Sequence, residues 1–250
     1  MIIGIDGNEA NVDQRVGIGQ YAYHVLLHLN RLYVQEQTKG KIQNVRFKIY
    51  LKYPPKSDLP LETHGWEYSM FGPKKGWTQC ALPFRLYTEK EKVNVFFSPS
   101  HYAPRFCPVP YFISIMDLSY IYFPQMFDQK DLYQLVHWTD YSVHKAEKIF
   151  TISEFSKKTI VEHYKITPEN VIVTYPGYNK EIYKVNHGKN TTDKSILKKQ
   201  FQIFFPYILF VGTLQPRKNL VGLIEAFQWM IKKTHTKNIQ LVIVGKKGWL

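Results

Sequence analysis

The chain has 250 residues, of which 44% are hydrophobic and 16% aromatic, a composition that is typical of a folded globular protein and excludes a disordered one. Its net charge is +13, from 33 basic and 20 acidic residues, which favours an anionic partner such as a nucleotide, a phospholipid surface or a nucleic acid. Two cysteines give no metal-ligand spacing and no disulfide framework, and the start lacks a secretory signal, so we expect a cytoplasmic location. The lysine pairs are scattered, however, and solvated basic faces are the alternative explanation of the charge.

Short apolar runs alternate with segments of helical periodicity. The predicted strands of this first part cover residues 2–5, 47–51, 93–97, 111–116, 149–152 and 171–174. The predicted helices cover residues 20–33, 77–87, 128–148 and 153–164. Asp128 and Ser153 are the predicted N-caps of the last two helices. Alternation of this kind predicts an α/β fold with a mostly parallel sheet covered by helices.

A polar, turn-rich segment at 186–193 marks a change in the chain. We therefore predict a first domain over 1–177, a linker over 178–205 and a second domain that starts at 206–250. The predicted elements of the second domain are a strand at 208–211, a helix at 220–233 and a strand at 239–244. Both strands are continuously apolar, which is typical of strands buried on both faces of a parallel sheet. One helix covers one face only, so we expect the front part of a longer polypeptide; burial on the first domain or in an oligomer is the alternative.

Residues 210–219 have the pattern of a phosphate-binding turn. Gly212 ends an apolar strand and lets main chain approach a ligand. Arg217 and Lys218 supply charge-assisted donors, and a helix that begins near Asn219 adds the positive end of its dipole. Two cations at this end of a helix are unfavourable unless an anion lies between them. The pattern therefore favours anion binding over two solvated surface cations.

A second glycine-rich segment, 17–22, matches the dinucleotide-binding pattern. The loop from residue 5 to 17 is too long for a tight turn, and no acid ends the second predicted strand; both observations argue against a dinucleotide-dependent dehydrogenase. We interpret Gly17 and Gly19 as a flexible loop at a helix start that approaches an anion. A plain turn before a helix is the alternative.

Asp117 directly follows an apolar strand, so it lies at the carboxyl end of a parallel strand, where open α/β sheets bind ligands. The run Asp-Leu-Ser favours equally an aspartate that caps a turn. The histidines have no partner at metal-ligand spacing, and the chain has no Asp-x-Asp motif for a metal–diphosphate site. We therefore predict no metal and no cofactor.

Several of these segments carry a common resemblance. They are residues 17–21, 97–100, 117–119, 151–157, 175–177 and 211–219. In order and spacing they resemble the retaining glycosyltransferases of the GT-B architecture that form family 4. The resemblance implies two Rossmann-like domains, the first for the acceptor and the second for a nucleotide-sugar. It assigns the donor diphosphate to Arg217 and Lys218 and the donor-phosphate loop to Gly17 and Gly19, and it implies no metal.

The chain departs from the family pattern in two places. Many members have a histidine just before the aspartate numbered 117 here, where this chain has Met116, so no histidine role is implied at that position. The later acidic motif of the family, which binds the sugar and ribose of the donor, would lie beyond Leu250. We therefore expect this chain to lack part of the donor site and to be inactive by itself.

The resemblance also bears on substrates and location. It implies transfer of a hexose to a glycan or lipid-linked acceptor, in polysaccharide biosynthesis, with mannose from a GDP donor as the sugar that the family suggests. Lipid-linked acceptors imply peripheral contact with an anionic membrane at its inner face. The alternative functions are a basic nucleotide- or nucleic-acid-binding α/β protein without catalysis, and an inactive remnant. We do not expect a nucleic-acid partner, because the charges form no single stripe and no nucleic-acid motif is present.

Overall fold

The computed structural model describes residues 1–42, 44–183, 191–204, 206–234 and 238–245. The chain forms two compact units, which are Met1–Pro124 with Asp128–Pro176, and Gly177–Leu250 with Gln125–Phe127. The finer boundaries 1–177, 178–205 and 206–250 stay a prediction. Within the predicted linker range lies a helix, α6 (Thr191–Phe201).

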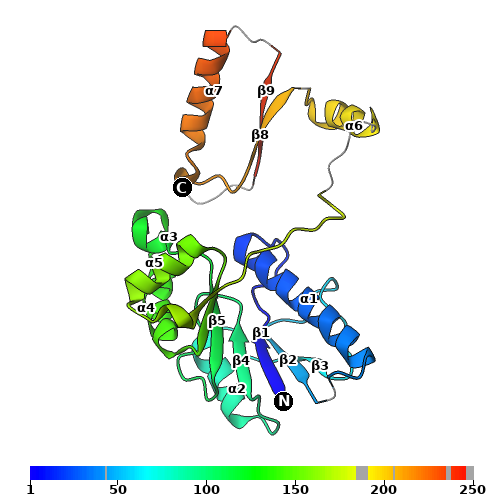
Figure 1. The fold of residues 1–250 in the computed structure, drawn as a ribbon, viewed down its shortest axis with the longest axis vertical. Helices are drawn as coiled ribbons and strands as arrows, with labels where there is room; N and C mark the ends of the chain where they lie inside the picture. Colours follow the sequence, from blue (N-terminus) through cyan, green and yellow to red (C-terminus); the bar gives the residue numbers. More distant parts are fainter. Residues whose placement is uncertain (43, 184–190, 205, 235–237, 246–250) are drawn as a thin grey trace. The chain divides into compact units, whose positions relative to one another are not determined.

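The first unit is built on a parallel sheet of seven strands in the order β3-β2-β1-β4-β5-β6-β7, part of which is labelled in Figure 1. The strands are β1 (Ile2–Asp6), β2 (Arg46–Leu51), β3 (Trp66–Met70), β4 (Val95–Ser98), β5 (Tyr111–Ile115), β6 (Lys148–Thr151) and β7 (Val171–Val173). This topology confirms the predicted α/β, Rossmann-like fold. The strand order reverses between β1 and β4, and open sheets of this kind bind ligands beyond the carboxyl ends of the strands at that point.

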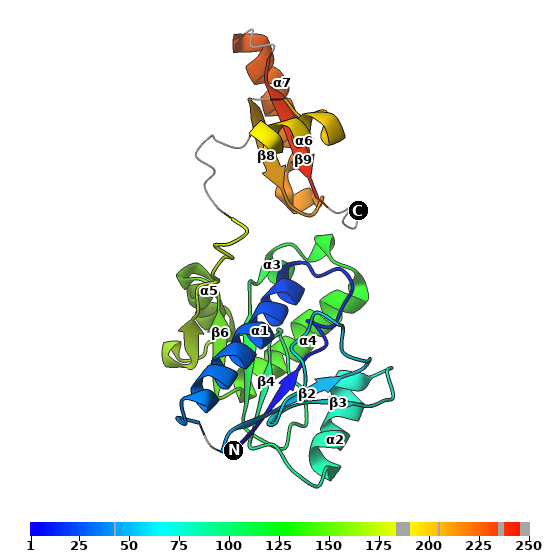
Figure 2. The ribbon, with the colours of Figure 1, turned by 90° about the vertical axis from the view of Figure 1, so that its right-hand side faces the viewer.

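Helices connect the strands. The helical elements of this unit are α1 (Gly17–Thr38), the π-helix η1 (Trp77–Ala81), α2 (Leu82–Thr88), α3 (Ser119–Tyr122), α4 (Gln129–Lys145), α5 (Glu154–Tyr164) and η3 (Pro168–Asn170). The 3₁₀ turn η2 (Pro124–Met126) crosses the boundary between the two units. Figure 2 shows α1 in front of the sheet and α4 and α2 behind it. Both predicted N-caps are confirmed, because Asp128 accepts a hydrogen bond from the Lys130 N–H and Ser153 accepts one from the Ser156 N–H.

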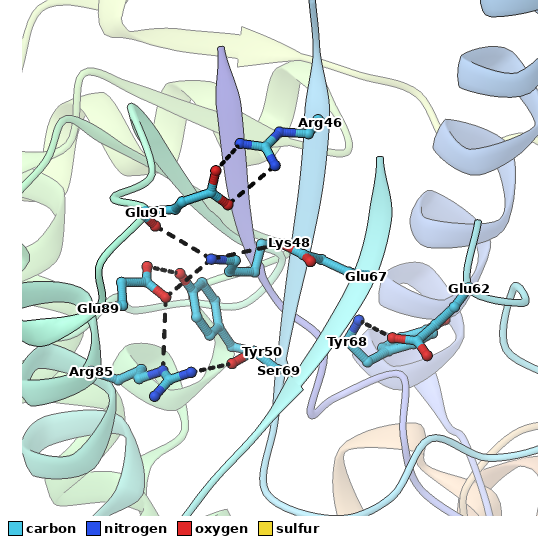
Figure 3. A network of polar contacts seen from close by, with 10 residues as sticks. All are labelled: Arg46, Lys48, Tyr50, Glu62, Glu67, Tyr68, Ser69, Arg85, Glu89 and Glu91. Carbon is cyan, nitrogen blue, oxygen red and sulfur yellow. Dashed lines mark hydrogen bonds and ion pairs between the residues drawn. The ribbon is translucent and has the colours of Figure 1, made fainter. Parts of the chain in front are cut away.

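The side chains of β2 alternate between these two faces, as the pleat of a strand requires. Phe47, Ile49 and Leu51 belong to the buried cluster that also contains Ala22 and Leu26 of α1. The side chains between them, Lys48 and Tyr50, point to the opposite face, toward the segment that follows α2 (Figure 3). α1 therefore covers the apolar side of β2, and a polar network covers the other side.

This polar network is centred on Lys48, which is 8% exposed. Its ammonium lies 3.3 Å from the Glu89 carboxylate and 3.6 Å from that of Glu67, and it donates to the Glu91 carbonyl at 3.3 Å. The Tyr50 hydroxyl donates to the other oxygen of Glu89 (Figure 3). A buried charge is tolerated when it is paired in this way, so the network fixes the segment after α2 on the middle of β2.

The second unit contains one strand–helix–strand element. Parallel strands β8 (Tyr207–Val211) and β9 (Gln240–Val244) are joined through the 3₁₀ turn η4 (Pro216–Lys218) and α7 (Leu220–Thr234). The predicted strand, helix and strand are thus confirmed. The described residues of β8, α7 and β9 include no buried side chain; Val211 is 69% exposed and Leu209 51%. The burial on both faces that is typical of such apolar strands is therefore absent from the described part of this unit.

Three element predictions need correction. The sequence analysis did not predict β3, an edge strand in which Trp66, Tyr68 and Met70 alternate with the polar Glu67 and Ser69. α1 begins at Gly17 and extends to Thr38, well beyond the predicted 20–33. The helix predicted over 77–87 begins as the π-helix η1 and becomes α-helical only at Leu82. Pro83 follows directly, and a proline has no N–H for a helical hydrogen bond.

Candidate functional site

At the switch point of the sheet, the loop after β1 is tied to the end of β2. Asp6 accepts hydrogen bonds from the main-chain N–H of Asn8 at 3.0 Å and from its side-chain amide at 2.6 Å. The Asn8 side-chain oxygen accepts the Lys52 N–H at 2.8 Å, and the Gly7 N–H bonds the Tyr50 carbonyl at 3.1 Å. The carboxyl of Asp6 is therefore held in place at the carboxyl edge of the sheet.

Two carboxyl groups lie near each other at this edge. Burial raises the pKa of Asp6, against the lowering effect of the hydrogen bonds from Asn8. The pKa of Glu9 is raised as well. The larger cause is that the surrounding protein keeps water from the carboxyl, and the second is the charge of Asp6, although much of the residue is exposed. Lys52 opposes both shifts. Carboxyls in such a position accept hydrogen bonds from hydroxyl groups, and the sequence analysis did not single them out.

The start of α1 lies beside this loop. Gly17 has φ +36°, and an added Cβ would have no atom within 4 Å. A Cβ on Gly19 would lie 3.0 Å from the Glu9 carbonyl oxygen, so the helix start and the loop are in close contact. No described side chain caps the first turn of α1, and the Gly19 N–H in this turn donates to the Val16 carbonyl at 2.8 Å. The hydroxyls of Tyr21 and Ser114, 3.1 Å apart, tie the same end of α1 to β5.

The serines of the segment after β4 have a structural role. The Ser98 hydroxyl donates to the Tyr102 carbonyl at 2.7 Å, and Ser98 is 1% exposed. The main-chain N–H of Ser114 bonds the Ser100 carbonyl at 3.1 Å. These contacts hold the turn at 98–102 against β5 and present His101 and Tyr102 beside the edge of the sheet.

Asp117 lies two residues beyond β5 and accepts a hydrogen bond from the Ser119 N–H at 2.8 Å. Asp117 therefore caps this turn, as the run Asp-Leu-Ser had indicated as the alternative to ligand binding. Its carboxyl also acts on His101: burial lowers the pKa of His101, while the charge and the main chain of Asp117 raise it. The His101 ring meets the buried Tyr120 edge-on, with centroids 5.9 Å apart.

The contact between His101 and Asp117 was missed from the sequence, which considered the histidines only at metal-ligand spacing. The signal was available, because 98–101 and 116–117 follow the neighbouring parallel strands β4 and β5, whose carboxyl ends meet at one edge. At Met116, where many family members have histidine, the carbonyl accepts a hydrogen bond from the Ser156 hydroxyl at 3.0 Å.

The second unit contains the other predicted site residues. The Gly212 N–H donates to the Val244 carbonyl at 3.0 Å, and a Cβ on Gly245 would lie 1.8 Å from the Gly212 carbonyl oxygen. Gly212 and Gly245 thus allow the ends of β8 and β9 to meet closely.

The turn before α7 has a defined cap. Asn219 has φ +49° and its side-chain oxygen accepts the Gly222 N–H at 3.3 Å, so this side chain caps α7. Lys218 is exposed at the same turn. The side chain of Arg217 lies outside the described residues. The structure therefore places Gly212, Lys218 and Asn219 on one strand–turn–helix element, and Gly17, Gly19 and Asp117 at one edge of the first unit.

Within the described residues, no group of three or more His, Cys, Asp or Glu side chains is arranged to hold a metal ion. A reaction without metal or cofactor stays a prediction. None of the helices in the described ranges combines the length and the apolar character needed to cross a bilayer.

This chain is similar to one protein family and to two curated proteins over part of its length. Residues 193–250 match the family model of glycosyl transferases group 1. The chain is 26% identical over 108 residues to the O-antigen chain mannosyltransferase B of Escherichia coli, covering 43% of this chain and 27% of that protein. It is 24% identical over 103 residues to the D-inositol 3-phosphate glycosyltransferase of Corynebacterium glutamicum (strain R), covering 41% and 24%. The matched part thus spans about a quarter of these curated relatives. With the Rossmann-like fold, these similarities support a glycosyltransferase of the GT-B type.

Proposed function

We propose that this chain acts in glycosyl transfer, moving a hexose with retention from a nucleotide-diphosphate sugar to a glycan or lipid-linked acceptor, as an enzyme of family 4. The observation that carries the proposal is the turn between β8 and α7. It combines a glycine strand end, an exposed lysine and the start of a fifteen-residue helix, within the segment that matches the glycosyltransferase family.

In this proposal the second unit holds the donor. The diphosphate lies against the Gly212 main chain and the amino end of α7, with Arg217 and Lys218 as charge-assisted donors. Cleavage of the sugar–phosphate bond develops negative charge on the departing diphosphate. Preorganised cations and N–H groups stabilise that charge by several kcal/mol, and for this reason the proposal needs no metal.

The first unit binds the acceptor in this proposal. The carboxyls of Asp6 and Glu9 accept hydrogen bonds from acceptor hydroxyls. His101 is kept neutral by its lowered pKa, so its ring can accept a hydroxyl proton in a hydrogen bond, and Asp117 orients that ring. Because the sugar is transferred with retention, the departing phosphate itself takes the proton of the attacking hydroxyl. The assignment of Gly17 and Gly19 to the donor phosphates is carried by the family resemblance alone.

Mannose from a GDP donor is the proposed sugar. The support is the name of the E. coli relative, a mannosyltransferase; the second relative is named only as a glycosyltransferase acting on an inositol phosphate. Net charge +13 and the lipid-linked acceptors of the resembled family support a cytoplasmic enzyme that contacts the inner face of an anionic membrane.

The test is a panel of nucleotide-sugars, including GDP-mannose and UDP-glucose, with this chain and with any longer polypeptide that its reading frame encodes. Thermal shift reports binding, mass spectrometry reports transfer to mannose-containing acceptors, and proton NMR of the product reports the anomeric configuration. The proposal expects a shift with one nucleotide-sugar and a product of retained configuration. Binding of single-stranded DNA in preference to every nucleotide-sugar would instead favour the basic binding protein.

A further inference from the structure

The loop after β1 is tied to the loop after β2 by two polar side chains, Asn11 and Arg15. The buried Asn11 donates its side-chain amide to the Pro54 carbonyl at 3.0 Å and accepts the Lys56 N–H at 2.8 Å. The two loops leave the carboxyl ends of neighbouring parallel strands. The ties therefore lie at the carboxyl edge of the sheet, next to the acidic residues of the loop after β1.

Three partners fix the side chain of Arg15. Its two terminal nitrogens bond the two carboxylate oxygens of Asp58 at 2.5 and 2.8 Å, and its Nε donates to the Ala10 carbonyl at 2.6 Å. The guanidinium also lies over the Tyr23 ring of α1, 4.1 Å from the centroid. The side chain of Arg15 is 10% exposed. Because a planar guanidinium paired at two points fixes geometry as well as charge, Arg15 joins both loops to α1.

The position of Glu9 depends on the main chain that Arg15 holds. Ala10, whose carbonyl accepts from Arg15, directly follows Glu9 and is fully buried. A Cβ on Gly19 would lie 3.5 Å from the Arg15 Cβ and 3.0 Å from the Glu9 carbonyl oxygen, so α1 packs against both residues at this point. Within the described part of the chain, the Glu9 carboxyl forms no hydrogen bond of its own. Its place beside Asp6 is therefore set by the backbone on either side.

We propose that Arg15 is a positioning residue: it holds the Glu9 carboxyl beside Asp6, where the two accept hydrogen bonds from an acceptor hydroxyl. The use of this edge for the acceptor rests on the proposed function, whereas the position of Glu9 can be measured without it. Asn11 remains as the second tie when Arg15 is replaced. Loss of Arg15 therefore displaces Glu9 while the rest of the loop stays attached.

The first experiment follows the titration of the Glu9 carboxyl by carbon-13 NMR in the unmodified chain, in Arg15→Ala and in Arg15→Lys, without any ligand. We expect the raised pKa of Glu9 to fall toward its ordinary value of 4.5 in both variants, because the displaced carboxyl gains water and moves away from Asp6. Loss of a positive charge by itself would raise this pKa in Arg15→Ala. The direction of the change thus separates displacement from a charge effect, and Arg15→Lys keeps the charge while it loses the two-point pairing.

The matched control is Arg46→Ala. Arg46 pairs with Glu91 through two hydrogen bonds of 3.1 and 2.7 Å, but it lies at the amino end of β2, away from the carboxyl edge. This variant should leave the Glu9 titration unchanged. In a transfer assay with GDP-mannose as donor and mannobiose as acceptor, Arg15→Ala should raise the acceptor KM by roughly fivefold or more with a smaller effect on kcat, and Arg46→Ala should leave the KM unchanged.

A Glu9 pKa that stays the same or rises in the Arg15 variants would overturn the inference; Arg15→Lys, the milder change, gives this result if Arg15→Ala does not fold. An acceptor KM that does not change in Arg15→Ala, or that changes equally in Arg46→Ala, would overturn the role in acceptor binding. The proposed function fails separately: a protein that transfers no sugar rejects it, while the Glu9 titration still decides what Arg15 holds. Transfer by a protein whose Glu9 titration ignores Arg15 keeps the proposed function and rejects the inference.

Discussion

At the scale of the residue, Asp6 is a carboxyl group whose burial affects the stability of the fold. Its carboxyl is half-buried at the end of β1 and keeps the two hydrogen bonds from Asn8, yet burial raises its pKa. A raised pKa means that the folded protein favours the protonated form. The stability that this gives is complete below the ordinary value of 3.8 and is lost as the pH rises through the folded-state pKa. At neutral pH the ionised Asp6 is therefore a destabilising group.

The prediction is that Asp6→Asn stabilises the protein at pH 7 by roughly 0.5–2 kcal/mol while it lowers transfer to the acceptor. Asparagine keeps the oxygen that accepts from Asn8 and removes the buried charge. Urea unfolding at a series of pH values measures the effect, and the gain should shrink as the pH falls toward 4. A gain that does not change with pH, or a loss of stability at pH 7, would contradict the charge-based explanation.

Gly245 is a residue whose lack of a side chain matters. A Cβ at this position would lie 1.8 Å from the Gly212 carbonyl oxygen, so main chain must shift to admit alanine. We predict that Gly245→Ala destabilises the pairing of β8 and β9 by about 1–3 kcal/mol. Hydrogen exchange of the Gly212 amide, which bonds the Val244 carbonyl, measures it. The control is Gly177→Ala, where an added Cβ would have no atom within 4 Å; equal exchange in both variants would refute the prediction.

At the scale of the element, the polar network behind β2 holds the segment after α2. Lys48 and Glu89 are both nearly inaccessible to solvent, whereas the neighbouring pair Arg46–Glu91, 2.7 Å apart, is exposed. We predict that Glu89→Ala costs about 3 kcal/mol of unfolding free energy, because it leaves Glu67, at 3.6 Å, as the ion-pair partner of Lys48 and removes the acceptor of the Tyr50 hydroxyl. Glu91→Ala, the exposed control, should cost no more than about 1 kcal/mol.

A double-mutant cycle extends this prediction. The variant that combines Lys48→Met with Glu89→Ala should be more stable than the sum of the single losses allows, because no unpaired buried charge is left. Additive losses in urea unfolding would show that the pair does not act as a unit. The same result would indicate that packing around α2, and not this network, fixes the segment.

An element could be predicted from the sequence when neighbouring residues determine it, and not when pairing with a distant strand determines it. α4 and α5 were predicted well because a local cap, Asp128 or Ser153, marks each start. β3 was missed although its apolar and polar residues alternate as in a half-buried strand, because it has only 5 residues and depends on pairing with β2. The partnership of His101 with Asp117 was missed because the sequence analysis considered the histidines only at metal-ligand spacing, and not as groups that follow the neighbouring strands β4 and β5.

At the scale of the whole molecule, the two units differ in how well their apolar side chains are buried. The first unit has a buried core and a parallel sheet whose strand order reverses between β1 and β4. The second has the strand–turn–helix element predicted from Phe210 to Asn219, with exposed apolar side chains on β8, α7 and β9. The order of elements followed from local periodicity. The acidic pair of Asp6 and Glu9 did not, because their coupling arises only when the loop after β1 folds back beside the sheet.

The central claim is that the turn before α7 holds the donor diphosphate, and donor kinetics of variants at that turn test it most directly. The variants are Arg217→Ala and Lys218→Ala, with Lys232→Ala as the control, because Lys232 is an exposed cation in the last turn of the same helix. The account predicts that each of the first two lowers kcat/KM for the nucleotide-sugar by roughly 10-fold or more and that Lys232→Ala leaves it unchanged. Donor kinetics that are unaltered in Arg217→Ala and Lys218→Ala would contradict the claim.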